Sequence, residues 1–330
     1  MQNQLKIETP PSERESDDKV FDTDMETVSG TKTDSDLFKI VGAGYKKHIP
    51  VMKKQTVRQK LKGKPIPSLI VFCAIAFGCI IAPVLANHDP NGFYLQNLNQ
   101  PPNAEFLFGT DSLGRDIFSM IWYGGRVSLI VGLLGAAIIA VIGTVYGSLS
   151  GTASERVDSV LMRITEMSGS IPGILLILVI TAVFNSNNVV TLSVVIGITA
   201  WFGLARIVRS EVRQIRNSDY VLYARSTGGR FLYIFKTHLV PNFIAAIMFA
   251  VVSSVGTAIT MESTLSFLGL GLPVDVISWG SMLSLANKAL VMNTWWVIIV
   301  PGVFLITTLV CITNMANFYR KEANKTPSNL

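Results

Sequence analysis

Residues Asp219–Asn242 read DYVLYARSTGGRFLYIFKTHLVPN, a polar, basic and glycine-interrupted segment between two long hydrophobic stretches. The flanking stretches, Val189–Val208 and Phe243–Thr264, consist mostly of apolar and small residues. Each is close to the roughly 20 helical residues that a hydrocarbon core requires. This arrangement predicts a membrane protein that presents a polar loop either to a partner protein or to the membrane surface.

The composition favours the same class of protein. Of 330 residues, 49% are hydrophobic and only 15% are charged, whereas soluble chains carry about a quarter charged residues. We therefore predict an all-α polytopic membrane protein with six transmembrane helices. The six apolar stretches are about Ile66–Ala86, Arg126–Leu149, Val157–Phe184, Val189–Val208, Phe243–Thr264 and Thr294–Ile312.

The distribution of Lys and Arg predicts the orientation of these helices, because cytoplasmic loops carry an excess of cations. Cations gather before the first stretch, between the fourth and the fifth, and after the sixth. They are Lys46, Lys47, Lys53, Lys54, Arg58, Lys60, Lys62 and Lys64; Arg206, Arg209, Arg213, Arg216, Arg225, Arg230 and Lys236; and Arg320, Lys321 and Lys325. The alternate loop Asn185–Asn188 has none, and Leu265–Asn293 has only Lys288. Both termini are therefore predicted to be cytoplasmic.

The chain divides into four predicted regions. Residues 1–45 form an acidic cytoplasmic tail that has too few apolar residues to fold and is expected to be disordered. Residues 46–125 hold a basic anchor, the first helix and an external loop. Residues 126–317 form a five-helix core with a cytoplasmic loop at 209–241, and residues 318–330 form a cytoplasmic tail.

The polar segment has the residues of two short helices joined at a bend. Asn217, Ser218 and Asp219 suit a helix N-cap, and Gly228 and Gly229 suit a helix end because glycine tolerates the left-handed conformation. A second helix would place Phe231, Ile234, Phe235 and His238 on one face. Pro241 fits the first turn of the following helix. The apolar face suits a groove on another protein, and an amphipathic loop on the membrane is the alternative.

Two further patterns concern helix ends and packing. In the external loop, Thr110 or Asp111 is expected to cap a short helix that runs toward the membrane. Gly143, Gly147 and Gly151 are four residues apart and form one helix face. Small residues at this spacing let helices approach closely in lipid. The partner helix could belong to this chain or to another.

Ionisable residues within the predicted spans are costly and are candidates for function. Arg163 and Glu166 are three residues apart and are expected to pair near the cytoplasmic interface, with a structural or gating role. Glu262 lies near the outer end of the fifth stretch, where it could line an external vestibule or cap the following loop. His238 is expected to make contacts within its loop, because the other two histidines are distant and no metal site is indicated.

Enzyme motifs are absent from the sequence. It contains no G-x-x-x-x-G-K-[ST] phosphate loop, no H-E-x-x-H and no G-x-S-x-G. We therefore predict no catalytic activity, no ATP site of its own, and no metal or other cofactor.

Several blocks resemble one transporter family. The string Phe108-Gly-Thr-Asp-Ser-Leu-Gly-Arg-Asp116 followed by Tyr123-Gly-Gly-Arg-Val-Ser-Leu129 is similar to C-type permease subunits of dipeptide, oligopeptide and nickel ABC importers, within the binding-protein-dependent transport inner-membrane component family. The polar segment resembles the loop that contacts the ATPase in such permeases, whose pattern is Glu-Ala-Ala, three residues, Gly, nine residues and an apolar-x-Leu-Pro ending. Ala224, Gly228 and His238–Asn242 match in register, whereas Leu222 and Tyr223 replace the usual Glu and Ala.

The resemblance implies a type I ABC importer permease in a bacterial cytoplasmic membrane. It further implies a second homologous permease subunit, two ATPase subunits and an external substrate-binding protein, with membrane lipid and without nucleic acid. The implied ATPase-coupling residues are Asp219, Tyr220, Ala224, Arg225, Gly228, Gly229, His238, Pro241 and Asn242. Import of di- and oligopeptides by alternating access is the expected function. The alternatives are a nickel or metal–chelator permease, an ion-driven secondary transporter, and a scaffold or receptor that uses the basic loop for docking.

Overall fold

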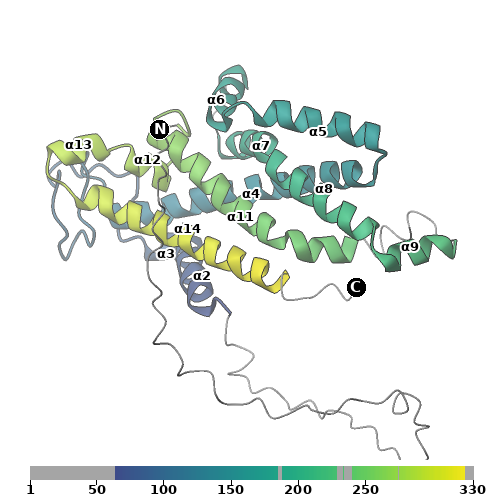
Figure 1. Cartoon of the computed structure of the whole chain (residues 1–330). Helices are drawn as coiled ribbons and strands as arrows, with labels where there is room; N and C mark the ends of the chain where they lie inside the picture. The colour runs from purple at the N-terminus through teal and green to yellow at the C-terminus, as the bar shows by residue number, and fades with distance from the viewer. Residues whose placement is uncertain (1–63, 185–187, 229–232, 234–239, 274, 324–330) are drawn as a thin grey trace, which may run out of the picture. The chain divides into compact units, whose positions relative to one another are not determined.

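The structure is a computed structural model that describes residues 64–184, 188–228, 233, 240–273 and 275–323, all within one compact unit, Thr56–Leu330 (Figure 1). The predicted tail 1–45, most of the basic anchor, Gly229 and His238 lie outside these residues. The described part is helical and contains no strand, which confirms the all-α prediction there. Its helices are α2 (Ile66–Ile80), α3 (Ala82–Leu85), α4 (Ile117–Thr152), α5 (Glu155–Gly169), α6 (Gly173–Phe184), α7 (Val189–Ala200), α8 (Phe202–Arg216), α9 (Asp219–Ser226), α11 (Val240–Phe267), α12 (Trp279–Leu283), α13 (Ala286–Val291) and α14 (Trp296–Ala323).

Three described helices are long and apolar enough to cross a membrane: α4, the Phe243–Phe267 part of α11, and α14. The pairs α5–α6 and α7–α8 would each serve as one further span, which gives up to five. Helix α2 is apolar but shorter, with 15 residues. The six-span arrangement and the cytoplasmic placement of both termini therefore stay predictions.

Helix α4 is the element around which the others pack. It contacts α7, α8 and α11 along its length and α2 near its start. In Figure 1 it runs behind α11 and α8, while α14 runs beside α11. The indole of Trp279 from α12 is fully buried in this assembly and donates a 3.0 Å hydrogen bond to the carbonyl oxygen of Ile121 on α4. The short α12 is thus fixed to the beginning of α4.

Two predicted spans differ from the helices observed. The third is interrupted by a bend of 83° between α5 and α6, at Ile171-Pro172, because a residue before proline is disfavoured in the helical region. The fourth bends by 47° between α7 and α8 and then continues to Arg216, beyond the predicted end. Each of these two predicted spans therefore corresponds to a bent pair of helices.

The ends of other helices also shift. Helix α4 begins at Ile117, well before the predicted Arg126, so the stretch before Arg126 is helical. Helix α14 continues to Ala323, past the predicted start of the C-terminal tail. Pro241 lies in the first turn of α11, as predicted from the fixed φ of proline.

Candidate functional site

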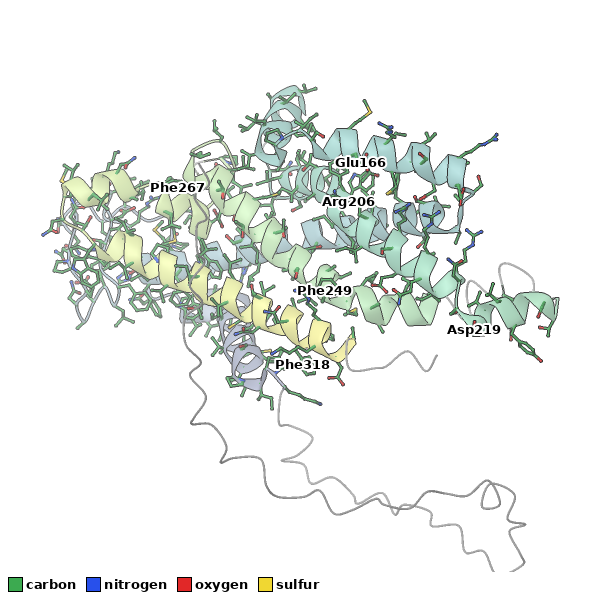
Figure 2. All side chains as sticks on the ribbon, in the orientation of Figure 1. Glu166, Arg206, Asp219, Phe249, Phe267 and Phe318 are labelled. Carbon is green, nitrogen blue, oxygen red and sulfur yellow. The ribbon has the colours of Figure 1, made fainter. Side chains whose placement is uncertain are left out.

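Helix α9 contains the first eight residues of the polar segment and follows α8 after only Asn217 and Ser218. Figure 2 shows Asp219 at its start, at the end of α8 that lies away from α7. The Ser218 carbonyl oxygen accepts the amide hydrogens of Val221 and Leu222 at 3.0 Å. Its hydroxyl instead donates to the Ile215 carbonyl at 2.6 Å. Ser218 therefore joins the two helices, and its side chain does not provide the predicted cap.

The far end of α9 agrees with the predicted glycine stop. At this end the backbone amide of Thr227 donates a 3.0 Å hydrogen bond to the carbonyl oxygen of Tyr223. Gly228 follows with φ +85°, a conformation that L side chains rarely adopt. A Cβ placed on Gly228 would meet nothing within 4 Å, so the backbone conformation, not space, favours glycine there.

One face of α9 is buried and the other is open. Val221 is 1% exposed and packs with Val212 of α8 and Phe243 of α11, with Ala224 partly buried beside them. Leu222 and Tyr223 are 48% and 71% exposed. The two residues that depart from the family pattern therefore lie on the outward surface. The backbones of Tyr220, Arg225, Pro241 and Asn242 lie in α9 and α11, but their side chains are outside the described set.

Three arginines of α8 point to the junction between α4 and α5. We call Arg209, Arg213 and Arg216, at i, i+4 and i+7, the arginine face. Arg209 binds the Asp158 carboxylate with both Nε, at 2.7 Å, and Nη2, and Arg213 Nη1 lies 3.4 Å from Asp158 Oδ2. The hydroxyl of buried Ser150 donates to Asp158 Oδ1 at 2.5 Å. The carboxylate is thus held from α8 and from α4 together.

The third member of the arginine face binds the end of α4. Arg216 Nη1 donates to the carbonyl oxygens of Thr152 at 2.9 Å and Ala153 at 3.1 Å. The last carbonyls of a helix lack intrahelical partners, and a cation there is also favoured by the helix dipole. The arginine face therefore binds both sides of the α4–α5 turn.

The glycine face of α4 lies against α8 of the same chain, so the partner helix is internal. A Cβ on Gly143 would lie 2.9 Å from Leu204 Cβ, and one on Gly151 would lie 2.9 Å from Val212 Cβ. At Gly147 it would lie 2.5 Å from the Ala205 carbonyl oxygen. The absence of side chains at these positions is what allows the backbones of the two helices to approach.

Arg163 and Glu166 lie on α5 with exposed side chains, and Figure 2 labels Glu166 on that helix. Among the described residues they form no ion pair with each other. The expectation of a mutual pair was wrong. On α5 it is Asp158 that pairs with arginines of α8, while Arg163 and Glu166 face outward. A gating role for Arg163 and Glu166 stays a prediction.

Glu262 lies inside the protein, fully buried between α4, α11 and α12. Its carboxyl group accepts hydrogen bonds from the hydroxyls of Ser128 at 3.0 Å, Ser263 at 3.1 Å and Ser266 at 2.9 Å. The expectation that Glu262 lines an open vestibule was wrong for this structure. Ser278, at the end of the loop that follows α11, also hydrogen-bonds to the carboxyl group, so the alternative in which Glu262 holds that loop stays a prediction.

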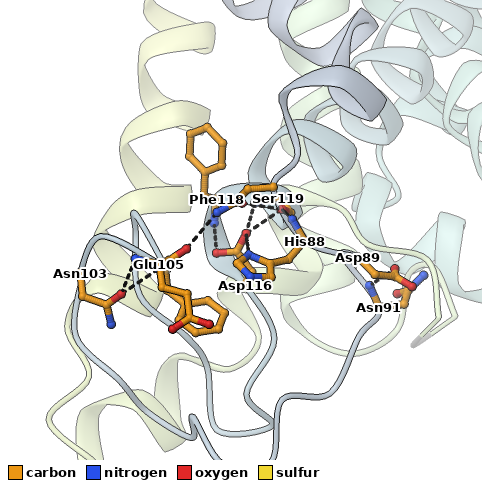
Figure 3. Close-up of polar contacts among 10 residues, drawn as sticks. His88, Asp89, Asn91, Asn103, Glu105, Asp116, Phe118 and Ser119 are labelled. Carbon is orange, nitrogen blue, oxygen red and sulfur yellow. Dashed lines mark hydrogen bonds and ion pairs between the residues drawn. The ribbon is translucent and has the colours of Figure 1, made fainter.

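The external loop is held by a different carboxylate from the one expected. Asp116 is fully buried and caps α4, accepting from the amide of Ser119 at 3.0 Å and from its hydroxyl at 2.6 Å (Figure 3). Asp111 instead accepts the amide of Leu113 and the guanidinium of Arg115, both at 2.8 Å, within the preceding turn. The prediction of a separate short helix capped by Thr110 or Asp111 was wrong, because the chain remains in turns until Asp116.

Beyond this geometry, comparison with known proteins identifies the family. Residues 143–321 match the family described as binding-protein-dependent transport system inner membrane component. This chain belongs to that family. The matched range begins within α4 and includes α5, α8, α9, α11 and nearly all of α14. The family comprises membrane components of transport systems, not enzymes, and together with the apolar helices it makes this chain a multi-pass membrane protein.

Individual family members are similar over most of the chain. The dipeptide transport system permease protein DppC of Bacillus subtilis is 36% identical over 252 residues, covering 76% of this chain and 78% of that protein. The oligopeptide permease OppC of the same organism is 34% identical over 262 residues, covering 79% and 86%. The probable D,D-dipeptide permease DdpC of Escherichia coli is 31% identical over 254 residues, covering 76% and 84%.

Some residues of this protein hold helices together in ways that the sequence did not indicate. The i, i+4, i+7 spacing of the arginine face was visible, but the cations were interpreted only as a sign of orientation. Ser150 and Ser128 gave no signal, because an isolated serine in a helix is common and its partners are distant in sequence. Only an acid and a set of cations at helical spacing could have suggested the contact with Asp158.

Proposed function

We propose that this chain is one of two membrane subunits of an ATP-driven importer of di- and oligopeptides in a bacterial cell membrane. The observation that carries this proposal is the identity of 34–36% to the dipeptide and oligopeptide permeases of Bacillus subtilis over about three quarters of the chain. The nickel, metal–chelator and ion-driven alternatives have no comparable support, because the relatives named above are peptide permeases.

The complete importer would contain a second permease, two ATPase subunits at the cytoplasmic face and an external substrate-binding protein. Six spans with both termini in the cytoplasm would place the loop containing α9 on the ATPase side. The exposed surface of α9, with Leu222 and Tyr223, suits a contact with the ATPase. The contact residues proposed here are the nine named above from Asp219 to Asn242.

The mechanism would be alternating access. ATP would close the ATPase pair, and this movement would displace α9 and reorient the membrane helices. Differential binding of the ATPase to two conformations of the permease is what such a shift requires. Peptide released by the binding protein would then pass between the two permease subunits.

The decisive experiment reconstitutes this chain with its permease partner, ATPases and binding protein in proteoliposomes. ATP-dependent uptake of a labelled dipeptide, absent with labelled nickel, is the expected result. Uptake of nickel alone, or uptake that follows an ion gradient without ATP, would contradict the proposal.

A variant of the helix end tests the ATPase contact. Gly228→Trp is expected to leave membrane insertion intact but to separate ATP hydrolysis from uptake. Gly269→Trp is a matched control, because Gly269 also has positive φ, at +75°, and open space around its Cβ position. Normal uptake and normal ATPase stimulation in Gly228→Trp would show that α9 does not form the coupling contact with the ATPase.

A further inference from the structure

We propose that Asp158 is the positioning residue through which movement of α8 and α9 displaces α5 and α6. This inference rests on the proposed function and concerns how force from the ATPase reaches the membrane helices. It is argued from three connections along one path: α9 to α8, α8 to α4, and α8 to α5.

The first connection makes α9 an extension of α8. Only Asn217 and Ser218 separate the helices, and the Ser218 hydroxyl is bonded back to Ile215 at 2.6 Å. Val221 of α9 is buried against Val212 of α8 and Phe243 of α11. A displacement of α9 therefore carries the C-terminal half of α8 with it.

The second connection keeps α8 fixed on α4. Val208 and Val212 lie against Gly147 and Gly151, where any added Cβ would overlap their side chains at 2.7–2.9 Å. Interlocked surfaces of this kind resist sliding, because a shift along the axis would drive side chains into backbone. Arg216 also binds the last carbonyls of α4. Helices α4, α8 and α9 thus move as one body.

The third connection depends on the ion pair. All of α5 is described, and its buried residues are Asp158, Met162 and Thr165. Apolar contact between α5 and the body is therefore small, and Val160, Ile164 and Met167 on α5 are exposed. A further bond runs from Tyr146 Oη to the Leu161 carbonyl at 2.8 Å. Asp158, with its bidentate contact to Arg209, is the strongest directional link.

The far end of α5 leads into the membrane region. After the 83° bend, α6 packs on α7, and a Cβ at Gly173 would come within 3.4 Å of the Met261 side chain of α11. Rotation of α5 about its anchored start would displace α6 relative to α7 and α11. Asp158 thus lies at the point where movement on the α9 side is converted into movement of the bent pair.

The test separates coupling from folding in the reconstituted importer. In Asp158→Asn, the amide oxygen still accepts from Ser150, but the ion pair with Arg209 is lost. The expected result is an assembled complex that still hydrolyses ATP. Per ATP it should take up at most about one fifth as much labelled dipeptide as the wild type, which is the lower end of typical coupling between two sites. Arg209→Gln provides a second variant if Asp158→Asn does not assemble, because its side chain is partly exposed.

Matched controls are available on the same helices. Glu155→Gln neutralises an exposed acid of α5, and Arg206→Gln neutralises an exposed cation of α8, without touching Asp158. Both should retain the wild-type ratio of peptide to ATP.

Two results would overturn the inference while the proposed function stands. One is an unchanged ratio in the assembled variants. The other is a parallel loss of assembly, ATP hydrolysis and uptake in both Asp158→Asn and Arg209→Gln, which is what a purely structural pair would give. A wild-type complex without ATP-dependent peptide uptake would instead refute the proposed function, before any variant is compared.

Discussion

The hydroxyl of Ser128 on α4 donates a 3.0 Å hydrogen bond to the carboxyl group of Glu262 on α11. The same hydroxyl oxygen accepts the backbone amide of Trp279 at 3.2 Å, so three helices meet at one serine. Glu262 forms no ion pair among the described residues, and serine hydroxyls alone satisfy it. A polar network of this kind, inside apolar helices, fixes how α4, α11 and α12 fit together.

Replacing this carboxyl group predicts a loss of stability. Glu262→Leu would leave the hydroxyls of Ser128, Ser263 and Ser266 buried without their acceptor, at a cost of about 1–3 kcal/mol. Glu262→Gln keeps an acceptor oxygen and should be milder. The measurement is the unfolding temperature of the purified complex in detergent, with Glu105→Gln in the external loop as an exposed control. Equal stability of the Leu variant and wild type would contradict the role of the network.

The glycines of α4 and α8 predict opposite effects of the same substitution. Gly147→Ala places a methyl group 2.5 Å from the Ala205 carbonyl oxygen, and overpacking of this kind destabilises by about 1–3 kcal/mol. Gly203→Ala on α8 meets nothing within 4 Å and should stabilise the helix by up to about 1 kcal/mol. Thermal unfolding of both variants in detergent checks the signs. A stabilising Gly147→Ala would show that α4 and α8 are not in close contact.

The sequence predictions succeeded where the structure depends on residues close together in the chain, and failed where it depends on distant ones. The helical class, the position of Pro241 in the first turn of α11 and the left-handed Gly228 shortly after α9 depend on local backbone preferences, which a sequence carries directly. The glycine face of α4 was also visible as a four-residue spacing. Its partner was not, because nothing local distinguishes α8 from a helix of another subunit.

The failures have a common cause in long-range competition. Arg163 and Glu166 have ideal spacing for a pair, yet the charge that is satisfied on α5 is Asp158, which reaches Arg209 on a helix 51 positions away. Glu262 was placed at an open end because hydropathy locates a residue along a helix axis but not around it. Asp111 and Asp116 are both good caps, and only the folded loop decides between them.

The external loop is hydrogen-bonded to α14 through the indole of Trp296, and this predicts a localised effect. Trp296 Nε1 donates a 3.0 Å hydrogen bond to the carbonyl oxygen of buried Thr110. A Cβ on the neighbouring Gly109 would lie 2.8 Å from that nitrogen, so the loop backbone lies directly on the ring. Trp296→Phe would leave the Thr110 carbonyl without this donor, at a cost of about 1 kcal/mol.

The measurement is the rate at which a protease cleaves the loop between α3 and α4 in the reconstituted complex, since loosening of a loop raises the population of cleavable conformations. Trp295→Phe is the matched control, because Trp295 is adjacent in sequence but 53% exposed. Cleavage should be faster in Trp296→Phe and unchanged in Trp295→Phe. Equal cleavage in the two variants would mean that packing of the loop, and not the indole hydrogen bond, holds it against α14.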